Sequence, residues 1–221
     1  MPTTIPLDAP KSDTYYALGR ADVIAHLPRP VGRVLDVGCG EGGAAQPLRE
    51  AGASYIAGIE ILPEPASRAE QVYDEVRCGD AIEQVRELSG EFDTVICYDV
   101  LEHLYDPYAL VEALFEITRP GGVLHVSVPN ASHVSLLRDL IVRGTFGYVP
   151  YGHRDATHVR WFTRRDIVAL VEEAGWRQLR TDPSKLWRKS RTLHALTRGR
   201  STEYLAAQWF VLSQKPGKQR D

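Results

Sequence analysis

Cysteine is scarce in this chain, with three residues among 221, at positions 39, 78 and 97. They form no CxxC pair, so neither a disulfide framework nor a structural zinc site is expected. Long apolar runs are also lacking: no stretch approaches the ~18 residues that a membrane-spanning helix needs, and the first residues do not resemble a signal peptide. We therefore expect no transmembrane segment, no secretion, and a reducing, cytoplasmic setting.

The chain has little net charge, −3 in total, but the charge is unevenly distributed. Residues 1–130 carry 9 Lys and Arg against 21 Asp and Glu, whereas residues 131–221 carry 17 against 8. The first part suits a cationic ligand and the second an anionic acceptor or partner, unless both are simply solvated surfaces. With 43% hydrophobic and 25% charged residues, the composition is that of a globular domain and excludes a disordered or fibrous chain.

Short apolar runs alternate with helical stretches over the first 130 residues, which is typical of βαβ units on a parallel sheet. This pattern predicts strands at 33–37, 55–61, 75–78, 92–98 and 122–128, and helices at 43–51, 64–73, 81–88 and 108–118. Two more strands are expected at 176–181 and 208–214, after a helix that Thr163 caps and that ends at Glu173. The expected fold is α/β: a Rossmann-like, seven-stranded, doubly wound and mostly parallel sheet in a single domain, with an inserted helix-loop after strand 5.

The strongest local signal is VLDVGCGEGG at 34–43, where a strand leads into a glycine-rich turn before a helix. Gly38, Gly40 and Gly43 also satisfy GxGxxG, the pattern of dinucleotide-binding domains, so the glycines alone do not identify a ligand. Asp36 favours one choice, because a carboxylate two residues before the first glycine would repel a pyrophosphate. A cationic or zwitterionic ligand reverses that preference, and S-adenosylmethionine carries both an ammonium group and a sulfonium.

Further carboxylates stand at the ends of the next predicted strands. Glu60, 20 residues after Gly40, is placed to accept hydrogen bonds from both ribose hydroxyls, unless it is a solvated strand-end charge. Asp80 either accepts a hydrogen bond from an adenine amino group or caps the helix that follows it. The fourth strand ends in Tyr98-Asp99-Val100. Open α/β sheets bind ligands in the crevice at such strand ends, so we expect these side chains to share one site.

At these motifs the sequence resembles the class I S-adenosylmethionine-dependent methyltransferases, and in particular a bacterial subgroup associated with glycan or natural-product biosynthesis. The resemblance runs through VLDVGCGEG, GIE, CGDA, FDTVICYDVLEHLYDP and RPGGVLHVSVPN, and beyond residue 130 through PNASHVSLLRDLIVRGTFGY and DATHVRWFT. The resemblance implies the following cofactor contacts: Asp36, Gly38 and Gly40 at the methionine end, Glu60 at the ribose, Asp80 and Ala81 at the adenine, Tyr98, Asp99 and Val100 near the sulfonium, and Tyr16 and Arg20 from a covering helix.

The same resemblance implies one methyltransferase domain over residues 1–221, in four parts. These are an N-terminal cofactor-covering helix (1–30), a cofactor-binding core (31–130), an acceptor-side insertion (131–160), and a C-terminal helix with edge strands (161–215). A family resemblance identifies neither the acceptor nor the oligomeric state, for which a homodimer is one option.

Two histidines are candidates for the base that a hydroxyl acceptor needs. His103 follows the fourth strand, beside the expected methyl group, and an unperturbed imidazole has a pKa of ~6.5. His158 is the second candidate, with Asp155 placed to orient it, and either histidine can instead cap a helix or support a loop. Asp99, Glu102 and His103 also form a DxxEH cluster. It resembles the ExxEH set with which some methyltransferases hold a divalent ion such as Mg²⁺, but we assign no metal ligands from it.

We therefore predict an S-adenosylmethionine-dependent O-methyltransferase that acts on a hydroxyl of a carbohydrate or related small molecule. An RNA methyltransferase is one alternative, because the stretch 185–200 is basic, although its partial apolar stripe also fits a packed amphipathic helix. A non-catalytic cofactor-binding protein is the other, since the glycine turn, Glu60 and Asp80 indicate binding more firmly than turnover. Asp36 disfavours a dinucleotide-dependent oxidoreductase.

Overall fold

The computed structural model describes residues 20–149, 152, 154–184 and 201–217. Within these ranges, seven strands form one sheet in the order β3-β2-β1-β4-β5-β7-β6. Strands β1 to β5 pair in parallel, and β7 runs antiparallel to both β5 and β6. The predicted fold class is confirmed. The strand bounds are β1 Gly32–Val37, β2 Ala53–Glu60, β3 Glu75–Cys78, β4 Phe92–Tyr98, β5 Thr118–Pro129, β6 Arg177–Pro183 and β7 Gln208–Gln214.

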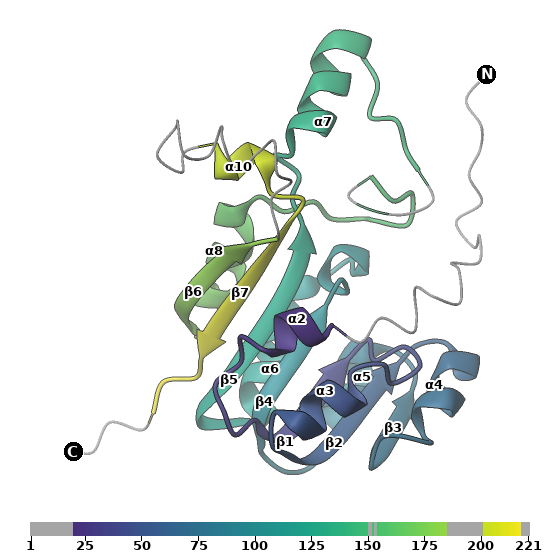
Figure 1. The fold of residues 1–221 in the computed structure, drawn as a ribbon, viewed down its shortest axis with the longest axis vertical. Helices are drawn as coiled ribbons and strands as arrows, with labels where there is room; N and C mark the ends of the chain where they lie inside the picture. The colour runs from purple at the N-terminus through teal and green to yellow at the C-terminus, as the bar shows by residue number, and fades with distance from the viewer. Residues whose placement is uncertain (1–19, 150–151, 153, 185–200, 218–221) are drawn as a thin grey trace.

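Strand β1 lies where the strand order reverses, because the chain builds β2 and β3 on one side of it and β4 and β5 on the other (Figure 1). Asp36, near the end of β1, pairs in register with Gly58 of β2 and Ile96 of β4. Such a reversal opens a crevice at the carboxyl ends of the strands. The fold therefore places Asp36 beside that crevice.

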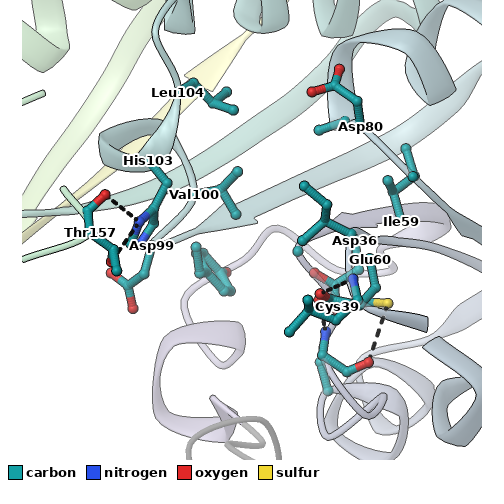
Figure 2. A pocket seen from close by; sticks show the side chains of 18 of the residues that line it. Asp36, Cys39, Ile59, Glu60, Asp80, Asp99, Val100, His103, Leu104 and Thr157 are labelled. Atoms are coloured by element: carbon teal, nitrogen blue, oxygen red, sulfur yellow. Dashed lines mark hydrogen bonds between the residues drawn. The ribbon is translucent and has the colours of Figure 1, made fainter. Parts of the chain in front are cut away.

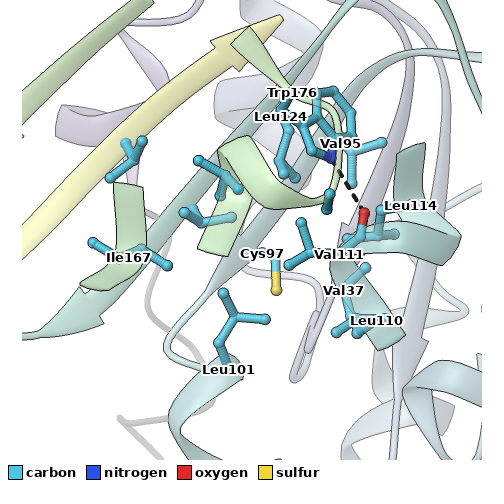
Figure 3. Close-up of a cluster of buried hydrophobic side chains, with 14 of the residues drawn as sticks. Val37, Val95, Cys97, Leu101, Leu110, Val111, Leu114, Leu124, Ile167 and Trp176 are labelled. Atoms are coloured by element: carbon cyan, nitrogen blue, oxygen red, sulfur yellow. Dashed lines mark hydrogen bonds between the residues drawn. The ribbon is translucent and has the colours of Figure 1, made fainter. Parts of the chain in front are cut away.

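Both faces of the sheet are covered, which explains why its central strands are continuously apolar. Successive residues Val34 and Leu35 point to opposite faces and are both fully buried. Leu35 belongs to the larger cluster, which Figure 3 shows around Leu124, Leu110 and Trp176. Val34 belongs to the second cluster.

The longer helices lie close to the predicted positions, although their ends differ. They are α3 Ala45–Glu50, α4 Pro63–Ala69, α5 Ala81–Glu87, α6 Pro107–Ile117 and α8 Arg164–Glu173. The helix predicted at 43–51 begins at Ala45 because Gly42, with φ of +80°, is still in the turn. The helix predicted at 64–73 ends at Ala69, and the following turn leaves Tyr73 buried.

The predicted insertion after strand 5 is confirmed in its described part. Helix α7 Val134–Arg138 continues as a π-helix, Asp139–Arg143, and Figure 1 shows this segment projecting from the body of the domain. The remaining short elements are α2 Ala21–Ile24, a 3₁₀ turn at Leu101–His103 and α10 Thr202–Leu205.

Two expectations fall wholly or partly outside the described residues. They are the covering helix with Tyr16, of which only α2 and its flanks are described, and the basic stretch 185–200. No helix in the ranges that the structure covers has the length and apolar character needed to cross a membrane.

Thr163 caps α8 as predicted, through a capping box with Asp166. The Thr163 amide donates to Asp166 Oδ2 at 2.9 Å, and the Asp166 amide donates to Thr163 Oγ1 at 3.4 Å.

We expect Thr163→Ala to lower the free energy of unfolding by about 1 kcal/mol, and Thr163→Ser to leave it nearly unchanged. Urea denaturation checks this. If the wild type and both variants were equally stable, the capping box would contribute nothing, and burial of Ile167 and Val171 would stabilise α8 without it.

Candidate functional site

A cavity of about 530 Å³ lies at the carboxyl ends of β1, β2, β3 and β4 (Figure 2). Of the residues predicted to contact the cofactor, all that lie in the described ranges line this cavity. They are Asp36, Gly38, Gly40, Glu60, Asp80, Ala81, Tyr98, Asp99 and Val100, together with Arg20. The structure therefore brings residues from four strand ends, and one from the chain before α2, to a single site.

The glycine turn forms one wall of the cavity. Its backbone conformation and close packing exclude residues larger than glycine at position 38. Gly38 has a φ of +75°, and a Cβ there would lie 2.4 Å from Cγ2 of Val100. The amides of Gly38 and Cys39 both donate to the carbonyl of Ile59, at 2.8 and 3.0 Å. The turn is thereby fixed against the end of β2.

Glu60 joins the glycine turn to the end of β2. Its Oε2 accepts from the Gly40 amide and its Oε1 from the Leu62 amide, both at 3.0 Å. Each carboxylate oxygen has a second lone pair, so this buried side chain retains capacity for two hydroxyl donors. The geometry fits the ribose contact that the resemblance implies.

Asp36 is a buried carboxylate whose pKa lies near neutrality. Burial raises this pKa from 3.8 to about 7; the hydrogen bond from the Tyr73 hydroxyl, 2.6 Å from Oδ2, opposes the increase, and the nearby charge of Glu60 adds to it. A cationic group in the cavity would favour the ionised form of Asp36. The Asp36 carboxylate, as a buried hydrogen-bond acceptor, therefore fits the ammonium group of S-adenosylmethionine.

Asp80 serves as a helix cap and also lines the cavity. Its Oδ1 accepts from the amides of Ile82 and Glu83, at 2.9 and 3.1 Å, at the start of α5. In the described part of the chain, no hydrogen bond is recorded for Oδ2. The two roles considered for Asp80 are therefore compatible.

Asp99 forms a network that the DxxEH comparison did not anticipate. It adopts a left-handed backbone conformation with φ of +56°, and its carboxylate is ion-paired with Arg20. Its Oδ1 also accepts from Ser127 Oγ at 2.9 Å and from Gln208 Nε2 at 2.7 Å. With these three donors engaged, Asp99 is not arranged as the first ligand of a metal site.

A different trio of possible metal ligands is clustered in the described part of the chain. One ligand atom from each of Glu102, His103 and His158 lies within 4.8 Å of the other two, and Glu102 and His158 are buried. Mixed imidazole and carboxylate donors suit Zn²⁺ and several other divalent ions. These are the described residues that could hold a metal, and sequence reasoning had not grouped His158 with Glu102.

Of the two candidate bases, His103 lines the cavity and His158 lies behind it. The two rings are in T-shaped contact with centroids 4.8 Å apart, and His158 Nε2 is 3.9 Å from Glu102 Oε1. This geometry favours His103 as the imidazole that meets an acceptor.

Thr157 is a cavity residue that sequence reasoning missed. Its carbonyl and its hydroxyl oxygen lie 3.3 and 3.2 Å from His103 Nδ1 (Figure 2). Its hydroxyl donates to Asp155 Oδ1 at 2.7 Å. Asp155 thus reaches His103 through Thr157. The Asp-x-Thr spacing, which favours a local side-chain turn, was the available signal.

Comparison with known proteins places this site in a family. The family model described as methyltransferase domain matches residues 13–181. The ubiquinone biosynthesis O-methyltransferase of Xanthomonas campestris is 35% identical over 114 residues, which cover 49% of this chain and 47% of that protein. The enzyme of the same name from Neisseria meningitidis is 32% identical over 159 residues, covering 65% and 63%. This chain therefore spans about half to two thirds of the length of these relatives.

Solved structures share the fold at low sequence identity. An S-adenosylmethionine-dependent methyltransferase from Archaeoglobus fulgidus superposes with a TM-score of 0.69 at 17% identity, covering 91% of this chain and 93% of that one. The [4+2]-cyclase SpnF superposes with a TM-score of 0.59 at 20% identity, covering 90% and 81%. Since the family match spans most of the chain and the predicted strand-end residues surround one cavity, the chain belongs to the methyltransferase domain family, as a class I member whose cofactor is S-adenosylmethionine.

Proposed function

We propose that the protein transfers the methyl group of S-adenosylmethionine to a hydroxyl of a carbohydrate or related small molecule. One observation carries the proposal: His103 lines the same cavity as Asp36, Glu60 and Asp80, so a base and the cofactor-binding carboxylates surround one volume. The names of the relatives support oxygen as the atom that is methylated. The carbohydrate class rests on the resemblance of the segments beyond residue 130.

The residues divide into a binding set and a reacting set. Asp36 and Glu60 hold the methionine and ribose ends, and the closely packed turn at Gly38 fixes the cofactor's position. Bound S-adenosylmethionine supplies a methyl group on a positively charged sulfur. His103 would take the proton of an acceptor hydroxyl placed beside that methyl group. Most of the rate enhancement comes from holding the acceptor in line with the leaving sulfur.

The test is incubation of the full chain with isotopically labelled cofactor and two panels of acceptors, one of sugars and one of phenols. Mass spectrometry then detects a product heavier by one methyl group in place of a hydrogen. Methylation of sugars supports the proposal. Methylation of phenols alone would overturn the carbohydrate class in favour of acceptors like those implied by the relatives' name. Calorimetric binding of the cofactor without any product in either panel would favour a non-catalytic protein.

The RNA alternative depends on residues 185–200, which lie outside the described ranges, and no described feature favours it. A filter-binding titration with RNA at two salt concentrations tests it, because binding through phosphate contacts weakens steeply as salt rises.

A further inference from the structure

We propose that Thr157, anchored by Asp155, is a positioning residue for His103. It selects the imidazole tautomer with the proton on Nδ1, which leaves the lone pair on Nε2. This inference rests on the proposed function, in which His103 takes the acceptor's proton, and it adds the groups that make His103 competent to do so.

The hydrogen bonds around Nδ1 define the tautomer. The carbonyl of Thr157, 3.3 Å away, can only accept, so Nδ1 must be the donor. The hydroxyl of Thr157 lies 3.2 Å from the same nitrogen, and its single proton is directed to Asp155 Oδ1 at 2.7 Å. The hydroxyl therefore also presents a lone pair to Nδ1. Both oxygens of Thr157 favour a protonated Nδ1, and the other ring nitrogen then carries the lone pair.

The backbone holds this arrangement in place. Asp155 Oδ1 accepts from the Thr157 amide at 2.9 Å as well as from the Thr157 hydroxyl. These two hydrogen bonds fix the turn at residues 155–157. The amides of Val159 and Arg160 both donate to the carbonyl of Glu102, at 2.9 and 3.0 Å. The acceptor-side loop is thus tied to the 3₁₀ turn that carries His103, although the two segments are far apart in the sequence.

The His158 ring packs edge-on against the His103 ring, and this contact limits rotation of His103. A ring flipped about its Cβ–Cγ bond would place Cδ2 against the Thr157 oxygens, so both contacts of Nδ1 with Thr157 would be lost. Thr157 opposes that state because its oxygens accept hydrogen bonds and its hydroxyl proton is committed to Asp155. Asp155 therefore orients Thr157, and Thr157 in turn orients His103.

The experiment is nitrogen NMR of the full-length chain labelled with ¹⁵N-histidine, recorded without acceptor. The His103 resonances are identified by their absence in His103→Gln. In the wild type we expect a protonated Nδ1 and an unprotonated Nε2. Thr157→Val, which removes the hydroxyl and its link to Asp155 but leaves the longer carbonyl contact, is expected to weaken the preference for a protonated Nδ1 and lower kcat about tenfold, with the Kd for S-adenosylmethionine unchanged. Thr157→Ser is expected to restore both readouts.

Thr118→Val is the matched control. It removes the hydroxyl of a buried threonine that donates to the carbonyl of Leu114 at 2.7 Å, at the opposite end of the sheet from the cavity. It should cost stability without moving the tautomer or kcat. A protonated Nε2 in the wild type overturns the proposal whether or not any variant folds, and so does a Thr157→Val protein with wild-type tautomer and kcat. If Nδ1 is protonated as expected but His103→Gln keeps full transfer activity, the proposed base role fails while the tautomer assignment stands.

Discussion

Replacing Asp36 with Asn is expected to weaken binding of S-adenosylmethionine by about 10- to 100-fold, because a hydrogen bond to a charged group contributes about 1.5–3 kcal/mol. The same substitution is expected to raise the free energy of unfolding at pH 8. Burial raises the pKa of Asp36 to about 7, so the folded protein bears a cost whenever this carboxyl is ionised. Asn accepts the hydrogen bond from Tyr73 without that cost.

The sign of the pH dependence follows from the direction of this shift. Between pH 3.8 and about 7 the unfolded chain ionises Asp36 more readily than the folded chain, so the wild type loses stability as pH rises through this window. The stability advantage of Asp36→Asn should therefore grow from pH 5 to pH 8. Urea denaturation at both values checks this, and an advantage that shrinks over the same range would contradict the assignment.

Cofactor binding should have the opposite pH dependence. The ammonium group of the cofactor favours ionised Asp36, so the affinity of the wild type should rise as pH increases through 7, with release of a proton on binding. Calorimetry in two buffers of different ionisation enthalpy measures that proton. Tyr73→Phe is the companion variant: it removes the hydrogen bond that lowers the pKa of Asp36, so the midpoint should move to higher pH. An unchanged pH profile in Asp36→Asn would assign the titration to another group.

The residues at the strand ends could be predicted from the sequence, but the residues that contact them could not. The strand ends were predictable because their signals are local: an apolar run, then Gly38 and Gly40, then a helix. The capping role of Asp80 and the box at Thr163 were predictable for the same reason, since each involves residues within one helical turn.

The partners of the site residues were not predictable, because they depend on how distant segments pack. Tyr73 was assigned to a helix, but the chain leaves the helix at Ala69 and brings the Tyr73 hydroxyl to Asp36. Asp99 resembled a metal ligand in the sequence, whereas its carboxylate contacts Arg20, just before α2, and Gln208 of β7. No periodicity in a single chain encodes such contacts, and the pKa of Asp36 depends on burial that only the folded structure defines.

The histidines provide the other prediction with a large expected effect. His103→Gln should lower kcat by about 10²- to 10⁴-fold, the range that general base catalysis contributes, while the Kd for S-adenosylmethionine stays within about twofold. His158→Gln should have a smaller effect, about tenfold, because His158 lies behind His103 and acts through its orientation. His26→Gln, at an exposed residue outside the cavity, is the matched control and should retain full activity.

The size of the His158 effect separates a lone base from a metal site. If Glu102, His103 and His158 held an ion, removal of any one ligand would impair the site as a unit, so His103→Gln and His158→Gln would lose similar activity. EDTA would then inactivate the wild type, and Mg²⁺ or Zn²⁺ would restore it. Unequal losses and full activity in EDTA would support a base that works without an ion. Full activity of both variants would contradict both readings, because neither imidazole would then take part in the reaction.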